Sequence, residues 1–254
     1  MSEPSVSCDC CGAGEVLRVL RYGRWVWRVT TEEAAAELAD LLRDPDAAFR
    51  AGSADAQSLK HDRGTSVAAV GRPPRWVVKR YHLAKALNPM KDLLRRTAAE
   101  RAFRSARALE QAGIATAPGL AFGVRRRMGL PVCSCLVSAY LAGTRPLVEV
   151  LPDGPTDAVL RAVATLLARL HDAGFANRDL KANNILVREG GEGGEQGSAT
   201  AYLVDLDGLR RGKRVSQSLR RKNLARLRRS FLEWPKAGRR AWDVLSAYYE
   251  QHAH

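Results

Sequence analysis

One short segment constrains this chain more than any other. It reads Asn177-Arg178-Asp179-Leu180-Lys181-Ala182-Asn183-Asn184, between a run with helical spacing of apolar residues and an apolar run typical of a strand. Phosphoryl transfer needs a carboxylate near the attacking hydroxyl, a cation beside the transferred group and an oxygen ligand for magnesium. Asp179, Lys181 and Asn184 provide these three groups. The segment therefore predicts a catalytic loop, with Asp179 and Lys181 as catalytic residues and Asn184 as a metal ligand.

The flanking sequence adds the other groups that a phosphotransferase needs. Downstream, an apolar run at 202–204 leads into Asp205 and Asp207, which resemble the magnesium-binding segment of the protein-kinase-like superfamily, and this resemblance implies that they bind magnesium. Upstream, Lys79 ends a strand-like run and is similar to the lysine with which that superfamily pairs the phosphates of a nucleotide. A long helix is expected from Pro89 to Gly113. Its middle carries Glu100, the expected partner of Lys79, and its last turn carries the alternative partner, Glu110.

The order lysine, helical glutamate, catalytic loop, strand and aspartate resembles the protein-kinase-like superfamily. Within it, the chain is most similar to the lipopolysaccharide core kinases, which phosphorylate Kdo or heptose sugars. The stretches that carry this resemblance are 77–82, 177–187, 205–213 and 222–231. The resemblance implies an α+β fold with two lobes, a small β-rich N-lobe and a compact, mostly helical C-lobe. It also implies ATP and Mg²⁺ as cofactors, and a sugar of a lipid-linked glycan as acceptor.

The sequence departs from the superfamily pattern at three places. The loop that covers the nucleotide phosphates should lie near 59–67, but only Gly64, with Thr65 and Ser66, is available there to bind nucleotide. Asn177 stands where most relatives have a histidine, a residue that mainly braces the loop. Asp207 replaces the glycine of Asp-Phe-Gly and could assist a second magnesium. The resemblance also assigns His171 a structural role beside the catalytic loop.

The pattern of apolar residues predicts two lobes after a flexible tail at 1–14: an N-lobe at 15–140 and a C-lobe at 141–254. A strand or hairpin is expected at 15–30, followed by a helix to about Leu42. Further strands are expected at 66–70, 76–81, 133–140, 185–188 and 202–204, and helices at 156–173 and from Ser216 to about Tyr249. The loop at 190–197 is expected to be a hairpin tip without chemistry.

The composition limits the class of protein. A chain of 254 residues with 46% apolar residues can bury a core without disulfides or a metal. Five cysteines, an odd number, and no signal-peptide pattern favour a reduced, cytoplasmic location. Cys8, Cys10 and Cys11 are too closely spaced to chelate one zinc ion, so we expect a reduced tail. Cys133 and Cys135 are expected to pack in the core.

The charge is concentrated in one part of the sequence. The net charge is +14, and residues 210–229 carry ten Lys or Arg and no acid. Four of them, Arg210, Arg211, Lys213 and Arg214, are expected to hold the protein on the anionic cytoplasmic face of a membrane. A nucleic-acid-binding protein is an alternative, although aromatic residues that could stack on bases lie only at the edge of this run.

A pseudokinase that serves as a nucleotide-binding scaffold is another alternative. A scaffold has no reason to keep Lys79, Asp179, Asn184 and Asp205 together, so an active enzyme is the preferred interpretation. Only 49 residues follow Asp205, which leaves little room for the helical subdomain with which protein kinases hold peptides. The expected acceptor is therefore a sugar hydroxyl and not a protein.

Overall fold

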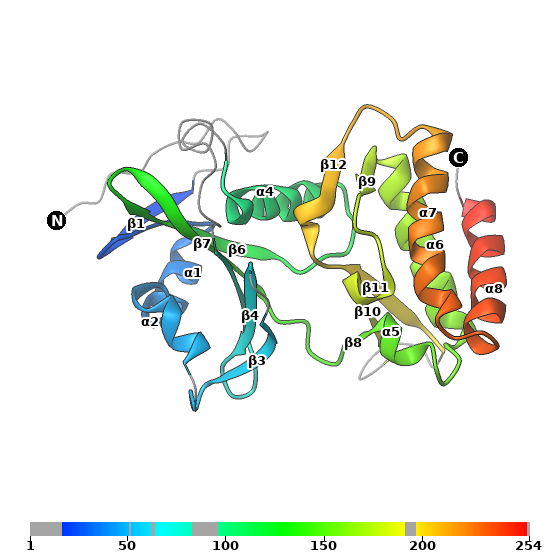
Figure 1. The fold of residues 1–254 in the computed structure, drawn as a ribbon, viewed down its shortest axis with the longest axis horizontal. Coiled ribbons are helices and arrows are strands. Elements are labelled where there is room, and N and C mark those ends of the chain that lie inside the picture. The colour runs from blue at the N-terminus through cyan, green and yellow to red at the C-terminus, as the bar shows by residue number, and fades with distance from the viewer. Residues whose placement is uncertain (1–16, 51, 62–63, 83–95, 191–196, 253–254) are drawn as a thin grey trace. The chain divides into compact units, whose positions relative to one another are not determined.

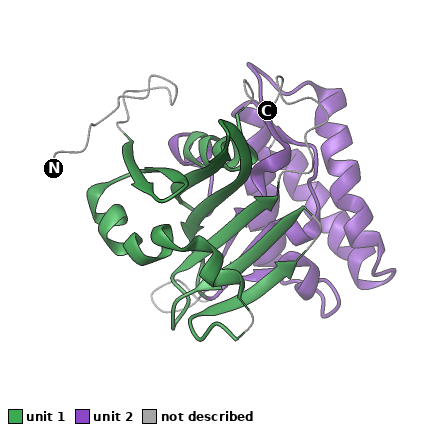
Figure 2. Ribbon diagram, turned by 60° about the vertical axis from the view of Figure 1, so that its left-hand side comes forward, with its two compact units in different colours: residues 1–108, 118–142 green, residues 109–117, 143–254 purple. Residues whose placement is uncertain are grey.

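The computed structural model describes residues 17–50, 52–61, 64–82, 96–190 and 197–252. The chain divides into two compact units, coloured green and purple in Figure 2. The first comprises residues 1–108 and 118–142, and the second comprises 109–117 and 143–254. The first unit thus ends at Ala142, close to the expected boundary at 140, and the short segment 109–117 belongs with the second unit. The expected tail at 1–14, with its three cysteines, lies outside the described residues.

An antiparallel sheet dominates the first unit (Figure 1). Its seven strands, counted over the described residues, lie in the order β1-β2-β6-β7-β5-β4-β3. They are β1 (Arg18–Tyr22), β2 (Trp25–Val29), β3 (Ala56–His61), β4 (Thr65–Val70), β5 (Trp76–His82), β6 (Gly119–Arg127) and β7 (Leu130–Ala139). Strands distant in sequence pair in its centre, because β2 pairs with β6 and β5 pairs with β7.

The register of the sheet gives each face its own set of side chains, because directly opposed residues point to the same side. Val67, Lys79 and Leu136 are opposed in register and define one face. Helix α4 (Ala98–Gln111) packs on this face, where Phe103 lies in a core cluster with Phe122 and Tyr81.

The opposite face carries the larger apolar core of the unit. In β2 the alternation of buried and partly buried residues places Trp25 and Trp27 on this face, where their rings stack 5.3 Å apart. Two short helices, α1 (Glu32–Glu37) and α2 (Ala39–Arg43), pack on this face. Leu38, between them, and Leu42, in α2, belong to the same core cluster as the two tryptophans. A Cβ at Gly123 would lie 2.5 Å from the Trp27 ring, so only glycine fits there.

The second unit is mostly helical. Its helices are α5 (Leu147–Val150), α6 (Asp157–Asp172), α7 (Gln217–Leu232) and α8 (Ala237–His252). Its strands form two small antiparallel sheets: β8 (Arg145–Pro146), β10 (Ile185–Glu189) and β11 (Ala199–Leu203) in one, and β9 (Phe175–Asn177) and β12 (Leu209–Arg211) in the other. Thr156 and Ser216 cap α6 and α7 through their hydroxyl groups, as expected for N-cap residues.

Most predicted elements are confirmed, including Cys133 and Cys135 as buried core residues. The prediction of a single helix from Pro89 to Gly113 is wrong, because residues 96 and 97 are not helical and α4 begins at Ala98. Residues 83–95 lie outside the described part of the chain. Five strands were not predicted: β3, β6, β8, β9 and β12. Within the described residues, no helix combines the length and apolar character needed to cross a bilayer.

Candidate active site

The predicted catalytic loop lies between β9 and the short 3-10 helix η2 (Ala182–Asn184). Asp179 is exposed, and its Oδ2 lies 2.9 Å from Lys181 Nζ. The Asn184 side chain is buried and donates its amide N–H to the backbone oxygen of Asp179 at 2.8 Å. The structure therefore brings Asp179, Lys181 and Asn184 together on one loop, as the sequence predicted. The ion pair holds the Asp179 carboxylate beside a cation while leaving it open to solvent.

Asn177 connects this loop to its surroundings, although its position at the end of β9 leaves it fully buried. Its side-chain oxygen accepts the N–H of Asp179 at 2.9 Å, and its side-chain nitrogen donates to the Asp205 backbone oxygen at 3.5 Å. Its own N–H donates to Oδ1 of Asn223 on α7 at 2.9 Å. Asn177 thus supplies the bracing contacts expected of the histidine that it replaces.

Asp205 and Gly208 form the other side of the same arrangement. Asp205 has a φ of +56°, a left-handed conformation that few residues other than glycine adopt. Val204 N–H donates to the backbone oxygen of Asn184 at 2.9 Å, and Arg178 N–H donates to the backbone oxygen of Gly208 at 3.0 Å. Backbone hydrogen bonds therefore connect the strand that precedes Asp205 to the catalytic loop.

The donor set suits magnesium better than a transition metal. Within the described residues, no three His, Cys, Asp or Glu side chains gather as a metal cluster would require. Magnesium needs fewer protein ligands, since one or two carboxylates or amides suffice when phosphate oxygens and water complete the octahedron. Asn184 uses its amide nitrogen to bind Asp179, which leaves its amide oxygen for a metal. Asn184 and Asp205 fit this role, and Asp207, which is exposed two residues later, remains a candidate.

His171 lies behind the loop and contacts the C-terminal helices. It is fully buried on α6, and its Nδ1 is 2.7 Å from the Tyr249 hydroxyl of α8. Burial, reinforced by the charge of Arg220, lowers its pKa to about 4. A neutral, hydrogen-bonded histidine in this position is structural, as the sequence suggested.

In the first unit, Lys79 lies in β5 on the face covered by α4. It is partly buried, and its ammonium group lies 4.9 Å from the centre of the Tyr81 ring. Glu100 lies in the first turn of α4 and not in the middle of a helix. Its carboxylate accepts hydrogen bonds from the Arg104 guanidinium at 2.8 and 3.2 Å. The proposed partnership of Lys79 and Glu100 remains a prediction.

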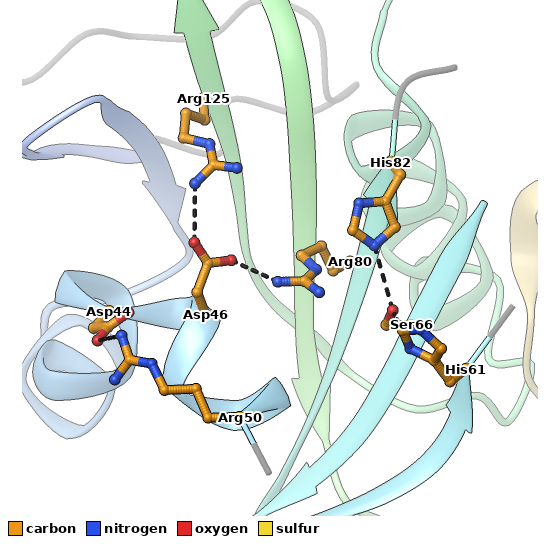
Figure 3. A network of polar contacts seen from close by, with 8 residues as sticks. All are labelled: Asp44, Asp46, Arg50, His61, Ser66, Arg80, His82 and Arg125. Carbon is orange, nitrogen blue, oxygen red and sulfur yellow. Dashed lines mark hydrogen bonds and ion pairs between the residues drawn. The ribbon is translucent and has the colours of Figure 1, made fainter. Parts of the chain in front are cut away.

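The candidate residues of the phosphate-covering loop point in different directions. Thr65 is opposed in register to Tyr81, so it shares the face of Lys79. Ser66 is fully buried on the other face, with its hydroxyl 3.0 Å from His61 Nδ1 and 3.3 Å from His82 Nε2 (Figure 3). Ser66 could therefore contact a nucleotide on the Lys79 face only through its backbone. Gly64 accepts a backbone hydrogen bond from His82 at 2.9 Å.

Beside Ser66, Figure 3 shows an ion-pair network that the sequence did not reveal. Asp46 binds Arg80 at 2.7 Å and Arg125 at 2.9 Å, and thereby connects a 3-10 helix (Pro45–Phe49) to strands β5 and β6. Because Arg80 follows Lys79, this network fixes the strand that carries the lysine. Asp46 gave no signal in the sequence, since its partners lie 34 and 79 residues away.

Comparison with known proteins decides the family. The model of the lipopolysaccharide kinase (Kdo/WaaP) family matches residues 49–249, which include every predicted site residue. The chain belongs to this family. A 3-deoxy-D-manno-octulosonic acid kinase of Mannheimia succiniciproducens is 31% identical over 120 residues, which cover 44% of this chain and 47% of that protein. The corresponding kinase of Xanthomonas axonopodis pv. citri is 34% identical over 128 residues, covering 50% and 47%. The chain thus spans about half the length of these curated relatives.

Comparison with solved structures identifies the fold of this Kdo/WaaP family member. A WaaP protein solved in complex with acyl carrier protein matches with a TM-score of 0.60 at 20% identity, over 92% of this chain and 89% of that one. The amicoumacin kinase hAmiN, solved with AMP-PNP, matches with a TM-score of 0.55 at 10% identity, over 88% and 81%. At these identities the matches establish the fold alone. The α+β, protein-kinase-like fold predicted from the sequence is confirmed.

Proposed function

We propose that this protein is an ATP- and Mg²⁺-dependent phosphotransferase that phosphorylates a hydroxyl group of a sugar. The observation that carries the proposal is the arrangement around Asn177. One buried side chain binds the backbones of both Asp179 and Asp205, the expected catalytic carboxylate and the expected metal ligand. Membership of the Kdo/WaaP family supports the same reaction class.

Each polar group has a defined role in this proposal. Asp179 is exposed, so it can orient an acceptor hydroxyl and accept its proton. Lys181, paired with Asp179 at 2.9 Å, would stabilise negative charge on the transferred phosphoryl group. Lys79 would bind nucleotide phosphates. Magnesium held by Asn184 and Asp205, with Asp207 as a further candidate, would neutralise charge on the phosphates.

The proposed acceptor is a lipid-linked glycan, such as the Kdo or heptose of a lipopolysaccharide core. The relatives named as 3-deoxy-D-manno-octulosonic acid kinases support a sugar acid acceptor. The short connection from Asp205 to α7, which begins at Gln217, also supports a small acceptor. Eleven residues, 206–216, leave no room for the long segment on which protein kinases bind peptides.

Magnesium-dependent nucleotide binding tests the assignment of the metal ligand. Asp205→Ala should abolish the ATP affinity that magnesium confers, because a main oxygen ligand is removed. Calorimetric titration with ATP, with and without MgCl₂, measures this effect. Asp153→Ala, which changes an exposed carboxylate in the same unit, should bind as the wild type does. Undiminished magnesium-dependent binding by Asp205→Ala would remove Asp205 from the site.

We further propose that the protein works on the cytoplasmic face of a membrane, where a lipid-linked acceptor is displayed. Arg210, Arg211, Lys213 and Arg214 are exposed and can approach anionic lipids. Co-sedimentation with anionic vesicles should therefore fall with rising salt, and should fall further when these four residues become glutamate. A variant with lysine at all four positions should bind as the wild type does. Equal binding to neutral and anionic vesicles would contradict membrane docking.

A further inference from the structure

Two arginines, Arg178 and Arg210, lie near each other at one end of the small β9–β12 sheet. In its register Ala176 is opposed to Arg210, and Asn177 is opposed to Leu209. Arg178 lies in the turn that follows β9, and its N–H donates to the backbone oxygen of Gly208, two residues before Arg210, at 3.0 Å. The two arginines are therefore neighbours across this pair of strands.

Both guanidinium groups are available to a ligand. Arg178 and Arg210 are exposed, and neither side chain makes a hydrogen bond or ion pair with any residue that the structure describes. Two neighbouring cations repel each other, and an anion bound between them would relieve this repulsion. Guanidinium groups are well suited to carboxylate and phosphate, which they can bind through two parallel hydrogen bonds.

The connecting segment does not supply this anion itself. Residues 206–216, which the structure describes throughout, contain one acid, Asp207, and four cations. Neither arginine pairs with a carboxylate of the described residues, so an anion that binds them would come from another molecule. Because Arg178 directly precedes Asp179, a molecule bound there would lie next to the residue that orients the acceptor hydroxyl.

We infer that Arg178 and Arg210 form a subsite for an anionic group, a carboxylate or a phosphate, carried by the acceptor sugar. This inference rests on the proposed function and makes it more specific: the enzyme selects acidic or phosphorylated sugars over neutral ones. The two arginines are specificity-determining residues, because they hold the acceptor by a group that does not react.

The same sheet provides a matched control. Arg211 is adjacent to Arg210 and exposed, but it falls on the opposite face, where its guanidinium lies 5.2 Å from the centre of the Phe175 ring. Removal of Arg211 changes the net charge by the same amount as removal of Arg210. A difference between the two variants therefore reports the position of the charge and not the overall charge of the protein.

The test compares water-soluble acceptors that differ only in charge: 3-deoxy-D-manno-octulosonate, its carboxamide, and a phosphorylated sugar with its unphosphorylated parent. Arg178→Ala and Arg210→Ala should each raise KM for the charged acceptors about tenfold to hundredfold, the factor that corresponds to one charge-assisted hydrogen bond. KM for the neutral acceptors, KM for ATP and kcat should change little. Arg210→Lys should recover part of the loss, and Arg211→Ala should retain wild-type discrimination.

Two results would overturn the inference: equal losses with charged and neutral acceptors, or loss of discrimination in Arg211→Ala. If the wild type phosphorylates none of these soluble sugars, binding of inorganic phosphate tests the arginine pair alone, and lipid A that carries Kdo tests the proposed function. Phosphate should raise the melting temperature of the wild type and of Arg211→Ala but not of Arg178→Ala or Arg210→Ala. The same phosphate response in all four proteins would show that the pair is not an anion site.

Discussion

Gly208 occupies a position where a single methyl group should disturb the proposed active site. A Cβ at this residue would lie 2.6 Å from the side-chain oxygen of Asn177 and 3.1 Å from the backbone nitrogen of Asp179. Gly208→Ala should therefore displace the catalytic loop and lower kcat, at a cost of about 1–3 kcal/mol in the free energy of unfolding. Chemical denaturation and initial rates measure the two effects.

Gly212→Ala is the matched control, because its Cβ would meet the nearest atom, the oxygen of Arg214, at an ordinary 3.5 Å. This variant should fold and turn over normally. If Gly208→Ala behaves in the same way, the close packing around Asn177 has no functional importance.

His171 should make the stability of the protein depend on pH. Its pKa in the folded protein is about 4, below the ordinary value near 6.5, because the ring is buried. As the pH falls, the unfolded chain therefore takes up this proton before the folded protein does. The stabilisation is complete above pH 6.5 and is lost between pH 6.5 and 4. From pH 7.5 to pH 5 this one group should lower the free energy of unfolding by about 2 kcal/mol.

Urea unfolding at the two pH values checks this expectation. His171→Gln should be less stable at pH 7.5, because the contact with Tyr249 is disturbed, but its stability should change less with pH. His252→Gln is the control, since it removes an exposed histidine from the same unit. An unchanged pH profile in His171→Gln would contradict the assignment.

At the scale of residues, the sequence predicts the candidate functional groups better than the residues that hold them in place by hydrogen bonds. Asp179, Asn184 and Asp205 could be proposed because their chemistry and spacing are recognisable within one stretch. Asn223 could not, since nothing in α7 indicates that its side-chain oxygen accepts the backbone N–H of Asn177. A contact between residues 46 positions apart depends on how α7 packs, which local patterns do not encode.

Helix α4 carries a prediction at the scale of elements. If Glu100 positions Lys79 for nucleotide binding, Lys79→Ala and Glu100→Ala should weaken ATP affinity non-additively, with a coupling of about 0.5–3 kcal/mol. Titration of both single variants and the double variant with ATP measures this coupling. Arg104→Ala serves as the control, because it removes a partner that Glu100 has on α4 itself and leaves both Lys79 and Glu100 in place.

Fully additive effects of Lys79→Ala and Glu100→Ala would direct attention to Glu110, or to no pair at all. Coupling of Glu100 to Arg104 alone, seen in stability and not in ATP affinity, would make the glutamate a structural residue of α4.

The strands that the sequence missed show where pattern-based prediction fails. β3, with the sequence Ala-Gln-Ser-Leu-Lys-His, is polar and mostly exposed, so it lacks the apolar alternation of a half-buried strand. β6 lies in the middle of the sheet and is buried on both faces. Its four consecutive buried residues, 121–124, therefore do not show the alternation of apolar and polar residues that predicts a strand. Its pairing with β2 joins segments about a hundred residues apart, and no local signal specifies that partner.

On the scale of the whole molecule, the order of motifs was more informative than the composition. Composition and charge were compatible with a kinase, a nucleic-acid-binding protein or a membrane-associated protein. The sequence of lysine, catalytic loop and aspartate selected the protein-kinase-like fold, and the family match over residues 49–249 confirmed it. The division at 142 lies close to the boundary expected at 140. The assignment of 109–117 to the second unit could not be predicted, because it depends on contacts such as that of Thr116 with Leu203.

The central claim is that Asp179 promotes phosphoryl transfer from ATP to a sugar of a lipid-linked glycan. The most direct test incubates purified protein with ATP, MgCl₂ and lipid A that carries Kdo, and follows the glycolipid by mass spectrometry. The wild type should add one phosphate group, while Asp179→Asn should bind ATP normally and transfer phosphate about a thousandfold more slowly. A wild-type protein that phosphorylates no glycolipid, or an Asp179→Asn variant with undiminished transfer, would contradict the account.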